Sequence, residues 1–164
     1  MKKLSPIHLL YELEKKNLSR AKGLPQQEKV QDVWSGISFR VGEFNFVAPL
    51  DQVHEILHYP MLTTVPGAIN WIKGVANVRG ILIAVSDLNL FLGKTPTQVS
   101  NKSRILIYRR EELAVGLLVN KVYGMKHFTD DEKVTAVKKF DESLRGYVLG
   151  AYKQNDDESL IFNM

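Results

Sequence analysis

The chain has 164 residues, of which 45% are apolar and 24% charged, a balance typical of a soluble globular protein with one domain or two very small ones. It contains no cysteine, which excludes disulfides, thiolate metal sites and cysteine nucleophiles. Most of the net charge of +4 lies in residues 1–33, where seven Lys and Arg accompany four Asp and Glu, and the nearly neutral remainder shows no basic cluster of the kind that binds nucleic acid.

Residues 1–33 are predicted to form a helical arm followed by a linker. Ser5 and Pro6 favour a helix start, and the helix is expected to span 6–22. The apolar side chains that recur at helical spacing are those of Ile7, Leu9, Leu10 and Leu13. Because Glu12 and its neighbours interrupt the apolar stretch, we expect neither a secretion signal nor direct membrane insertion. The arm either packs on the body or binds a partner.

From Trp34 onward the apolar residues alternate with polar ones, which predicts strands. The predicted strands are 34–41, 44–50, 53–57, 72–78, 81–87, 104–110, 113–119, 121–128, 146–152 and 159–164. Short helical turns are predicted at 67–71 and 88–92. Many short strands with regular turns are typical of a mainly β barrel or sandwich.

Two segments of the body resemble each other. Residues 39–59 align without gaps with residues 108–128, so that Arg40 matches Arg109. A shorter similarity relates 79–84 to 145–151. Repetition of one strand unit predicts two similar small barrels in sequence, and since barrels of about 60 residues have thin cores, we expect them to lean on one another.

The motifs of common enzymes and metal centres are missing from the sequence. His54 and His58 have the spacing of metal ligands on a helix, but on the predicted strand that spacing separates them by about 13 Å. The acidic runs 130–132 and 156–158 are interpreted as solvated loops, since a calcium site needs a fuller ligand set. We therefore expect no catalysis, metal or cofactor. The remaining alternatives are an enzyme with an unrecognised site and a barrel that binds nucleic acid.

Three stretches resemble the signature of the CheW-like domain family. They are FNFVAPLDQVHEIL (44–57), IKGVANVRGILIAVSDLNLFLG (72–93) and VGLLVNKVYGM (115–125), with Val78 and Asn120 standing where Leu and Asp are more usual. The resemblance covers roughly residues 34–162 and leaves 163–164 as a C-terminal end. Sequences of the family usually continue past this point, so the resemblance implies either a truncation or another element that completes the final barrel.

The resemblance implies two SH3-like five-stranded β-barrels packed around a shared core, with an N-terminal helix. It also implies a non-catalytic, cytoplasmic adaptor without a cofactor. The expected partners are a CheA-type histidine kinase and the cytoplasmic tip of a methyl-accepting chemoreceptor, most closely as in the adaptors of type IV pilus (twitching motility) systems. The alternatives are an adaptor of a flagellar or other chemosensory array, and a CheV-like protein without its receiver domain.

Site residues follow from the resemblance position by position. Val53, Glu55 and Gly74 match kinase-contacting positions, and Arg79 matches a position that couples receptor or kinase. The residues matched to the receptor groove are Val47, Leu50, Val115, Gly116 and Leu117. We expect Arg79 to form an exposed ion pair with Glu55, serving either a partner or the fold as a clamp. The apolar residues could equally be core, and Trp71 either a core lid or an interface anchor.

Overall fold

The computed structural model describes residues 7, 15–16, 33–111, 113–134 and 144–164. Contacts divide the chain into two compact units, Met1–Gln31 and Asp32–Met164. Within the first unit, the three described residues have helical backbone. The rest of the predicted arm helix, including its proposed packed face, lies outside the described residues.

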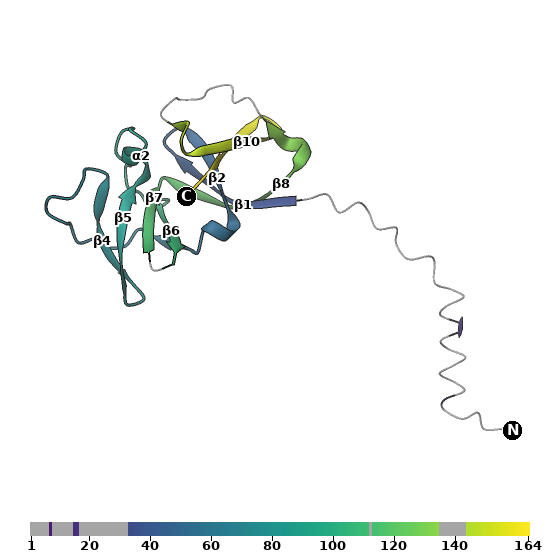
Figure 1. The fold of residues 1–164 in the computed structure, drawn as a ribbon, viewed down its shortest axis with the longest axis horizontal. Helices are drawn as coiled ribbons and strands as arrows, with labels where there is room; N and C mark the ends of the chain where they lie inside the picture. Colours follow the sequence, from purple (N-terminus) through teal and green to yellow (C-terminus); the bar gives the residue numbers. More distant parts are fainter. Residues whose placement is uncertain (1–6, 8–14, 17–32, 112, 135–143) are drawn as a thin grey trace. The chain divides into compact units, whose positions relative to one another are not determined.

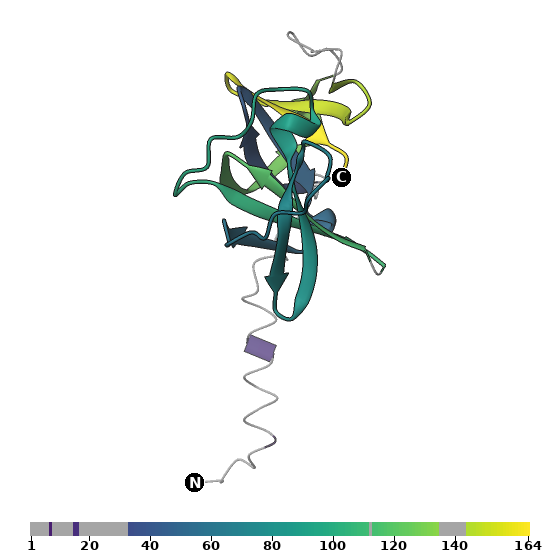
Figure 2. The same cartoon turned by 90° about the vertical axis from the view of Figure 1, so that its left-hand side faces the viewer.

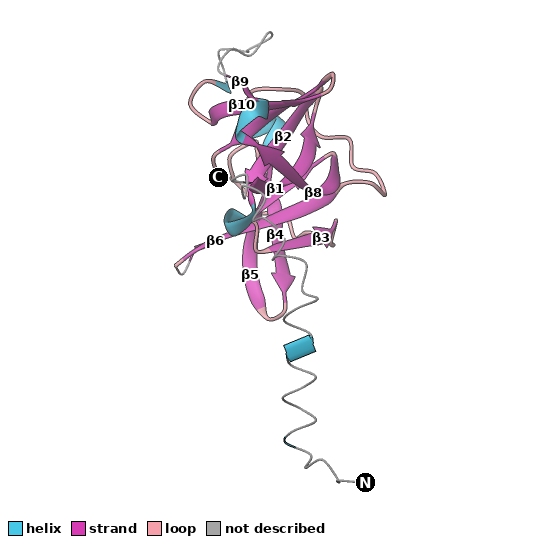
Figure 3. Ribbon diagram, turned by 90° about the vertical axis from the view of Figure 1, so that its right-hand side faces the viewer, coloured by secondary structure: helices cyan, strands magenta, loops and turns pink. Residues whose placement is uncertain are grey.

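The second unit is built almost entirely of strands, as predicted (Figure 3). Its strands are β1 (Val33–Val41), β2 (Phe44–Pro49), β3 (Glu55–His58), β4 (Ile72–Val78), β5 (Ile81–Asp87), β6 (Arg104–Arg110), β7 (Leu113–Val119), β8 (Lys121–Thr129), β9 (Lys133–Val134), β10 (Val148–Gln154) and β11 (Asp157–Phe162). Its helical turns are η1 (Leu50–Gln52), α2 (Leu88–Phe91) and η2 (Asp130–Glu132).

Two local predictions were wrong. The expected helical turn at 67–71 consists of hydrogen-bonded turns, in which Ile69 accepts from the amide of Ile72. The acidic runs were expected as solvated loops, but 130–132 is the 3₁₀ turn η2, closed by a capping box between Thr129 and Glu132, and β11 begins within 156–158. Asp130 and Asp131 are nevertheless exposed, as expected. The helical turn predicted at 88–92 is confirmed by α2.

The strands form two curled sheets that occupy opposite sides of the unit in Figure 1. One sheet has the order β8-β1-β2-β11-β10-β9 and the other β3-β6-β7-β5-β4. The first therefore has six strands where five were expected, because the two-residue β9 adds to β10. Figures 2 and 3 show the β4–β5 hairpin extending from the end of the unit opposite β10.

The repeat predicted between 39–59 and 108–128 is confirmed by the strand pairing. β1 pairs antiparallel with β2 and β8, and β6 pairs antiparallel with β7 and β3. β2 then runs parallel to β11, as β7 runs parallel to β5. The two barrels are not consecutive in sequence, however. After its hairpin, each repeat crosses over, so that β3 joins the second repeat's sheet and β8 joins the first.

A matching bulge extends the equivalence to the remaining strands. The register shifts between Ile72 and Gly74 where β4 meets β5, and between Val148 and Gly150 where β10 meets β11. β4 therefore corresponds to β10 and β5 to β11. The shorter similarity between 79–84 and 145–151 was misleading, because it matches β5 with β10, which occupy unlike positions.

A shared core joins the two sheets. One cluster contains Phe39 and Phe46 of the first sheet, Leu106 and Val119 of the second, and Leu88 of α2. Two smaller clusters lie inside the individual sheets. Successive residues of a strand point to opposite faces, so neighbours on one strand contribute to different clusters. The expectation that two thin barrels lean on one another is met by this arrangement.

Candidate functional site

The turn between β4 and β5 places a charged side chain in a backbone conformation that glycine or asparagine usually adopts. Val78 pairs with Ile81, which leaves Arg79 and Gly80 as a two-residue loop. Both have positive φ, 51° and 86°. Asn77 supports the loop, since its side-chain oxygen accepts from the amide of Gly80 at 2.8 Å. Hairpins of this kind favour Asn-Gly, because most other residues in the first position bring Cβ too close to the following carbonyl oxygen, at a cost of about 1–2 kcal/mol.

The guanidinium of Arg79 donates to the carboxylate of Glu55 at 2.7 Å, which confirms the predicted ion pair. Glu55 begins β3 and Arg79 follows β4, so the contact links the two outer strands of one curled sheet. The Arg79 side chain is 80% exposed and that of Glu55 27%. An ion pair this exposed contributes about 0–1 kcal/mol to stability, so the fold alone gives little reason for placing arginine there.

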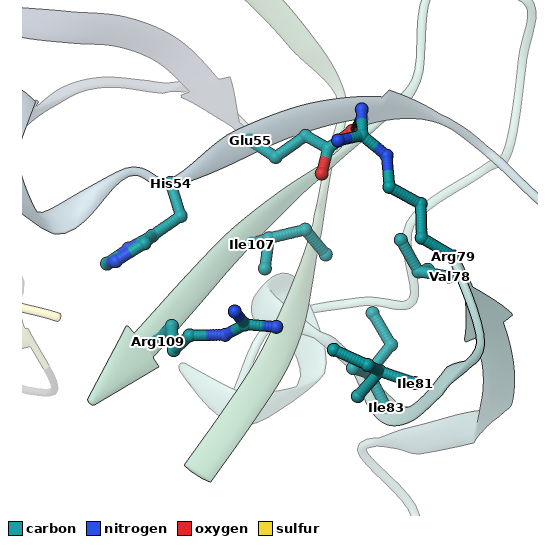
Figure 4. A pocket seen from close by; sticks show the side chains of 8 residues that line it. All are labelled: His54, Glu55, Val78, Arg79, Ile81, Ile83, Ile107 and Arg109. Atoms are coloured by element: carbon teal, nitrogen blue, oxygen red, sulfur yellow. Dashed lines mark hydrogen bonds and ion pairs between the residues drawn. The ribbon is translucent and has the colours of Figure 1, made fainter. Parts of the chain in front are cut away.

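A pocket of about 260 Å³ opens beside this ion pair (Figure 4). Its apolar residues are Val78, Ile81, Ile83 and Ile107, and its polar ones are His54, Glu55, Arg79 and Arg109. We call this set the arginine pocket. The ion pair was predicted from the sequence, whereas His54 and Arg109 were not expected to line a site, because they converge only when the sheet curls.

The other two expected kinase-contacting residues are less accessible. Val53 is half-buried and packs on the shared core. Gly74 is buried, with a φ of 146°, and the carbonyl of Thr63 crosses directly over it. The geometry therefore explains Gly74 by close backbone packing, without a partner.

A second, larger groove of about 410 Å³ lies between the two sheets and is almost wholly apolar. Val115 and Leu117, two of the residues expected in a receptor groove, line it. Trp71 also lines it, half-buried and edge-on to Phe91 with ring centroids 5.3 Å apart. Phe91 meets Tyr147 in the same way at 5.2 Å, so aromatic rings form one wall. We call this the apolar groove.

Three residues expected in the groove lie elsewhere. Val47 is fully buried among Phe128 and Ile161, inside the first sheet. Gly116 faces the other side of β7 from Val115 and Leu117, since a Cβ built at this position would lie 2.7 Å from the side chain of Ile105. Consecutive strand residues cannot share a face, which is why the expected set could not line one surface. Leu50 is exposed on η1, outside the lining of the groove.

The buried carboxylate of Asp87 organises the segment that follows β5. It caps α2 by accepting from the amide of Asn89 at 3.1 Å, and it accepts from the hydroxyl and amide of Thr97 at 2.6 and 2.9 Å. Asn89 in turn donates to Asn120, whose side-chain oxygen also accepts from Gly42. The Asp-Leu pair and Asn120, which belong to the signature stretches, are therefore structural.

Burial raises the pKa of the Tyr59 phenol, and the negative charge of Asp87 raises it further. Burial likewise raises the pKa of Tyr152, with a smaller contribution from Asp130. Neither phenol lines the arginine pocket or the apolar groove.

No three His, Asp or Glu side chains converge as a metal centre would need within the described parts of the chain. In those same parts, no helix has the length and hydropathy to cross a membrane.

Comparisons with known proteins identify relatives of the whole domain. Residues 35–163 match the CheW-like domain family. Protein PilI of Pseudomonas aeruginosa is 37% identical over 159 residues, which cover 97% of this chain and 89% of PilI. Chemotaxis protein CheW of Thermotoga maritima is 30% identical over 114 residues, covering 68% of this chain and 75% of its own.

A solved structure has the same fold. The scaffolding protein TtCheW from Thermoanaerobacter tengcongensis superposes with a TM-score of 0.69 at 25% sequence identity. The superposition covers 80% of this chain and 89% of that one.

Proposed function

The chain belongs to the family of CheW-like domain proteins, and on that premise we propose that it couples a methyl-accepting chemoreceptor to a CheA-type histidine kinase. Proteins of this family are scaffolds, and the chain is an adaptor and not an enzyme. It works in the cytoplasm, where it is recruited to membrane receptor arrays. No cofactor takes part, because binding alone carries the function.

The observation that carries this proposal is that the two candidate sites use opposite faces of one sheet. On β5, Ile81 and Ile83 line the arginine pocket, whereas Ala84 and Ser86 line the apolar groove. On β6, Tyr108 lines the groove and its two neighbours line the pocket. Since alternate strand residues face opposite ways, a partner in one site leaves the other open. An adaptor requires this separation.

The arginine pocket is assigned to the kinase. Its exposed ion pair contributes little to stability, while arginine in a left-handed conformation is held there at some cost. Strain of this kind, maintained at an exposed site, is consistent with a contact to another protein. Glu55 and Arg79 are the residues of the expected kinase set that remain accessible.

The apolar groove is assigned to the receptor tip. An amphipathic helix can lay its apolar face into a groove with anchors at helical spacing, and we propose that the receptor tip binds in this way. Val115, Leu117 and Trp71 supply apolar and aromatic surface for such a contact.

The pathway follows from the similarity to PilI, which extends over nearly the whole chain. We assign the adaptor to a type IV pilus or twitching motility system. Flagellar chemotaxis is the second candidate, because the CheW relatives match a smaller share of the chain.

Co-sedimentation tests the proposal. Receptor-containing vesicles, the kinase and this chain are mixed in all pairwise combinations and together. The kinase should pellet with the vesicles only when the chain is present. Equal sedimentation of the kinase without the chain would refute the coupling role.

A further inference from the structure

The two halves of the domain place equivalent arginines in different surroundings. Arg40 of β1 and Arg109 of β6 occupy the same position in the repeat, each one residue beyond the aromatic of its strand. Both side chains are exposed. Because the two hairpins pair in the same register, a difference in the contacts of the two arginine side chains indicates that they have different roles.

Arg40 is tied to its own hairpin. Its Nε donates to the carbonyl of Gly42 at 2.8 Å, and its backbone carbonyl accepts from the amide of Asn120. The side chain of Arg109 makes no hydrogen bond or ion pair with any described residue. Its guanidinium points across the arginine pocket toward Ile81 and Ile83, opposite the Glu55–Arg79 pair (Figure 4).

The charges around the pocket do not balance. Two guanidiniums lie beside a single carboxylate, and that carboxylate is already bound to Arg79. The positive charge of Arg109 therefore has no carboxylate partner among the lining residues, and it lies beside Ile81, Ile83 and Ile107. A guanidinium in such a place binds a carboxylate with two parallel hydrogen bonds, and the partly apolar surroundings strengthen that contact.

We propose that Arg109 recognises the kinase by pairing with an acidic side chain that lies beside an aliphatic one on the kinase surface. The aliphatic side chain rests on Ile81, Ile83 and Ile107, and its acidic neighbour reaches Arg109. This inference rests on the assignment of the pocket to the kinase. Arg109 is then a further residue that determines specificity for the kinase, and the kinase segment that it binds carries an aliphatic and an acidic side chain.

Calorimetric titration of the full chain with a purified CheA-type kinase from the same cell tests the proposal. The variants are Arg109→Gln and Arg109→Glu, and the matched control is Arg40→Gln, which removes the same charge from the equivalent strand. All three must melt near the temperature of the unmodified chain. Arg109→Gln should raise Kd by about 5–10-fold and Arg109→Glu by more, with a weaker dependence on salt. Arg40→Gln should bind within about twofold of the unmodified chain.

Charge reversal identifies the partner group. One Asp→Lys or Glu→Lys change in the kinase should restore the binding of Arg109→Glu while weakening that of the unmodified chain. If Arg79→Gly weakens kinase binding in the same titration but Arg109→Gln does not, the role proposed for Arg109 is wrong. The proposed function is unaffected by that result. Failure of the unmodified chain to bind the kinase would overturn both.

Discussion

The backbone carbonyl of Thr63 crosses so close to Gly74 that a Cβ at position 74 would lie 2.5 Å from its oxygen. Thr63 also exchanges backbone hydrogen bonds with Val75, which fixes the crossing segment against β4. The glycine stands at a bulge and has a φ of 146°. Both the space and the backbone conformation therefore require glycine.

Gly74→Ala should destabilise the domain by about 1–3 kcal/mol, because the added methyl group meets rigid backbone and the positive φ disfavours alanine. Chemical denaturation measures the change. The matched control is Gly146→Ala, since nothing lies within 4 Å of a Cβ there and its φ is not positive. If both variants unfold at the same denaturant concentration, close packing does not explain Gly74.

Asp87→Asn should cost about 2–4 kcal/mol of unfolding free energy. The change puts an amide NH₂ group where the amide and hydroxyl of Thr97 now donate to a buried carboxylate. Asp156→Asn is the control, because Asp156 is exposed in the β10–β11 turn. Equal stability of the two variants would show that the network does not hold this segment.

The stability of the domain should fall at alkaline pH. The pKa of Tyr59 is raised above its ordinary value of 10.0 in the folded protein, so its stabilising contribution is complete below pH 10 and is lost as the pH rises through the folded pKa. Tyr59→Phe should therefore make the unfolding free energy less dependent on pH above 10, as measured by denaturation at a series of pH values. The same alkaline slope with and without the phenol would contradict this assignment.

Leu113→Glu should weaken binding of a receptor-tip fragment while leaving the free energy of unfolding within about 0.5 kcal/mol of that of the unmodified chain. Leu113 lines the apolar groove with its side chain 62% exposed, so a charge there meets the partner and not the core. The control is Leu149→Glu, since Leu149 is 66% exposed but does not line the groove. Binding is measured by titration with the isolated receptor-tip fragment. Equal loss in both variants would indicate a nonspecific effect of charge.

Strand positions in the second sheet were largely predictable from the sequence, because its strands are short apolar runs separated by turns. The bounds of β4, β5, β6 and β7 agree with the predicted strands to the residue. The first residues of the strands were less predictable where hydrogen bonds of a local turn compete with strand pairing. β3 begins at Glu55, two residues later than predicted, because the chain first leaves the 3₁₀ turn η1, which ends at Gln52. β10 begins late because the amide of Tyr147 donates to the carbonyl of Leu144 in a turn.

The site was predicted only in part, because its surfaces depend on pairing between distant strands. The ion pair of Glu55 and Arg79 could be expected from matched motifs. The crossover of β3 into the second sheet leaves no local signal, and it places His54 and Glu55 beside β6, the strand that carries Arg109. Val47 was misplaced because a motif match does not say which face of a strand a residue occupies.

The most direct test of the account is the binding of the kinase by Arg79→Gly, measured together with its melting temperature. Glycine adopts the positive φ of this turn without strain, so the melting temperature should stay the same or rise slightly, despite the loss of the ion pair. Kinase binding should weaken by about tenfold or more, because the guanidinium is a partner contact in this account. A large drop in melting temperature with unchanged kinase binding would make Arg79 a structural clamp and contradict the assignment of the pocket.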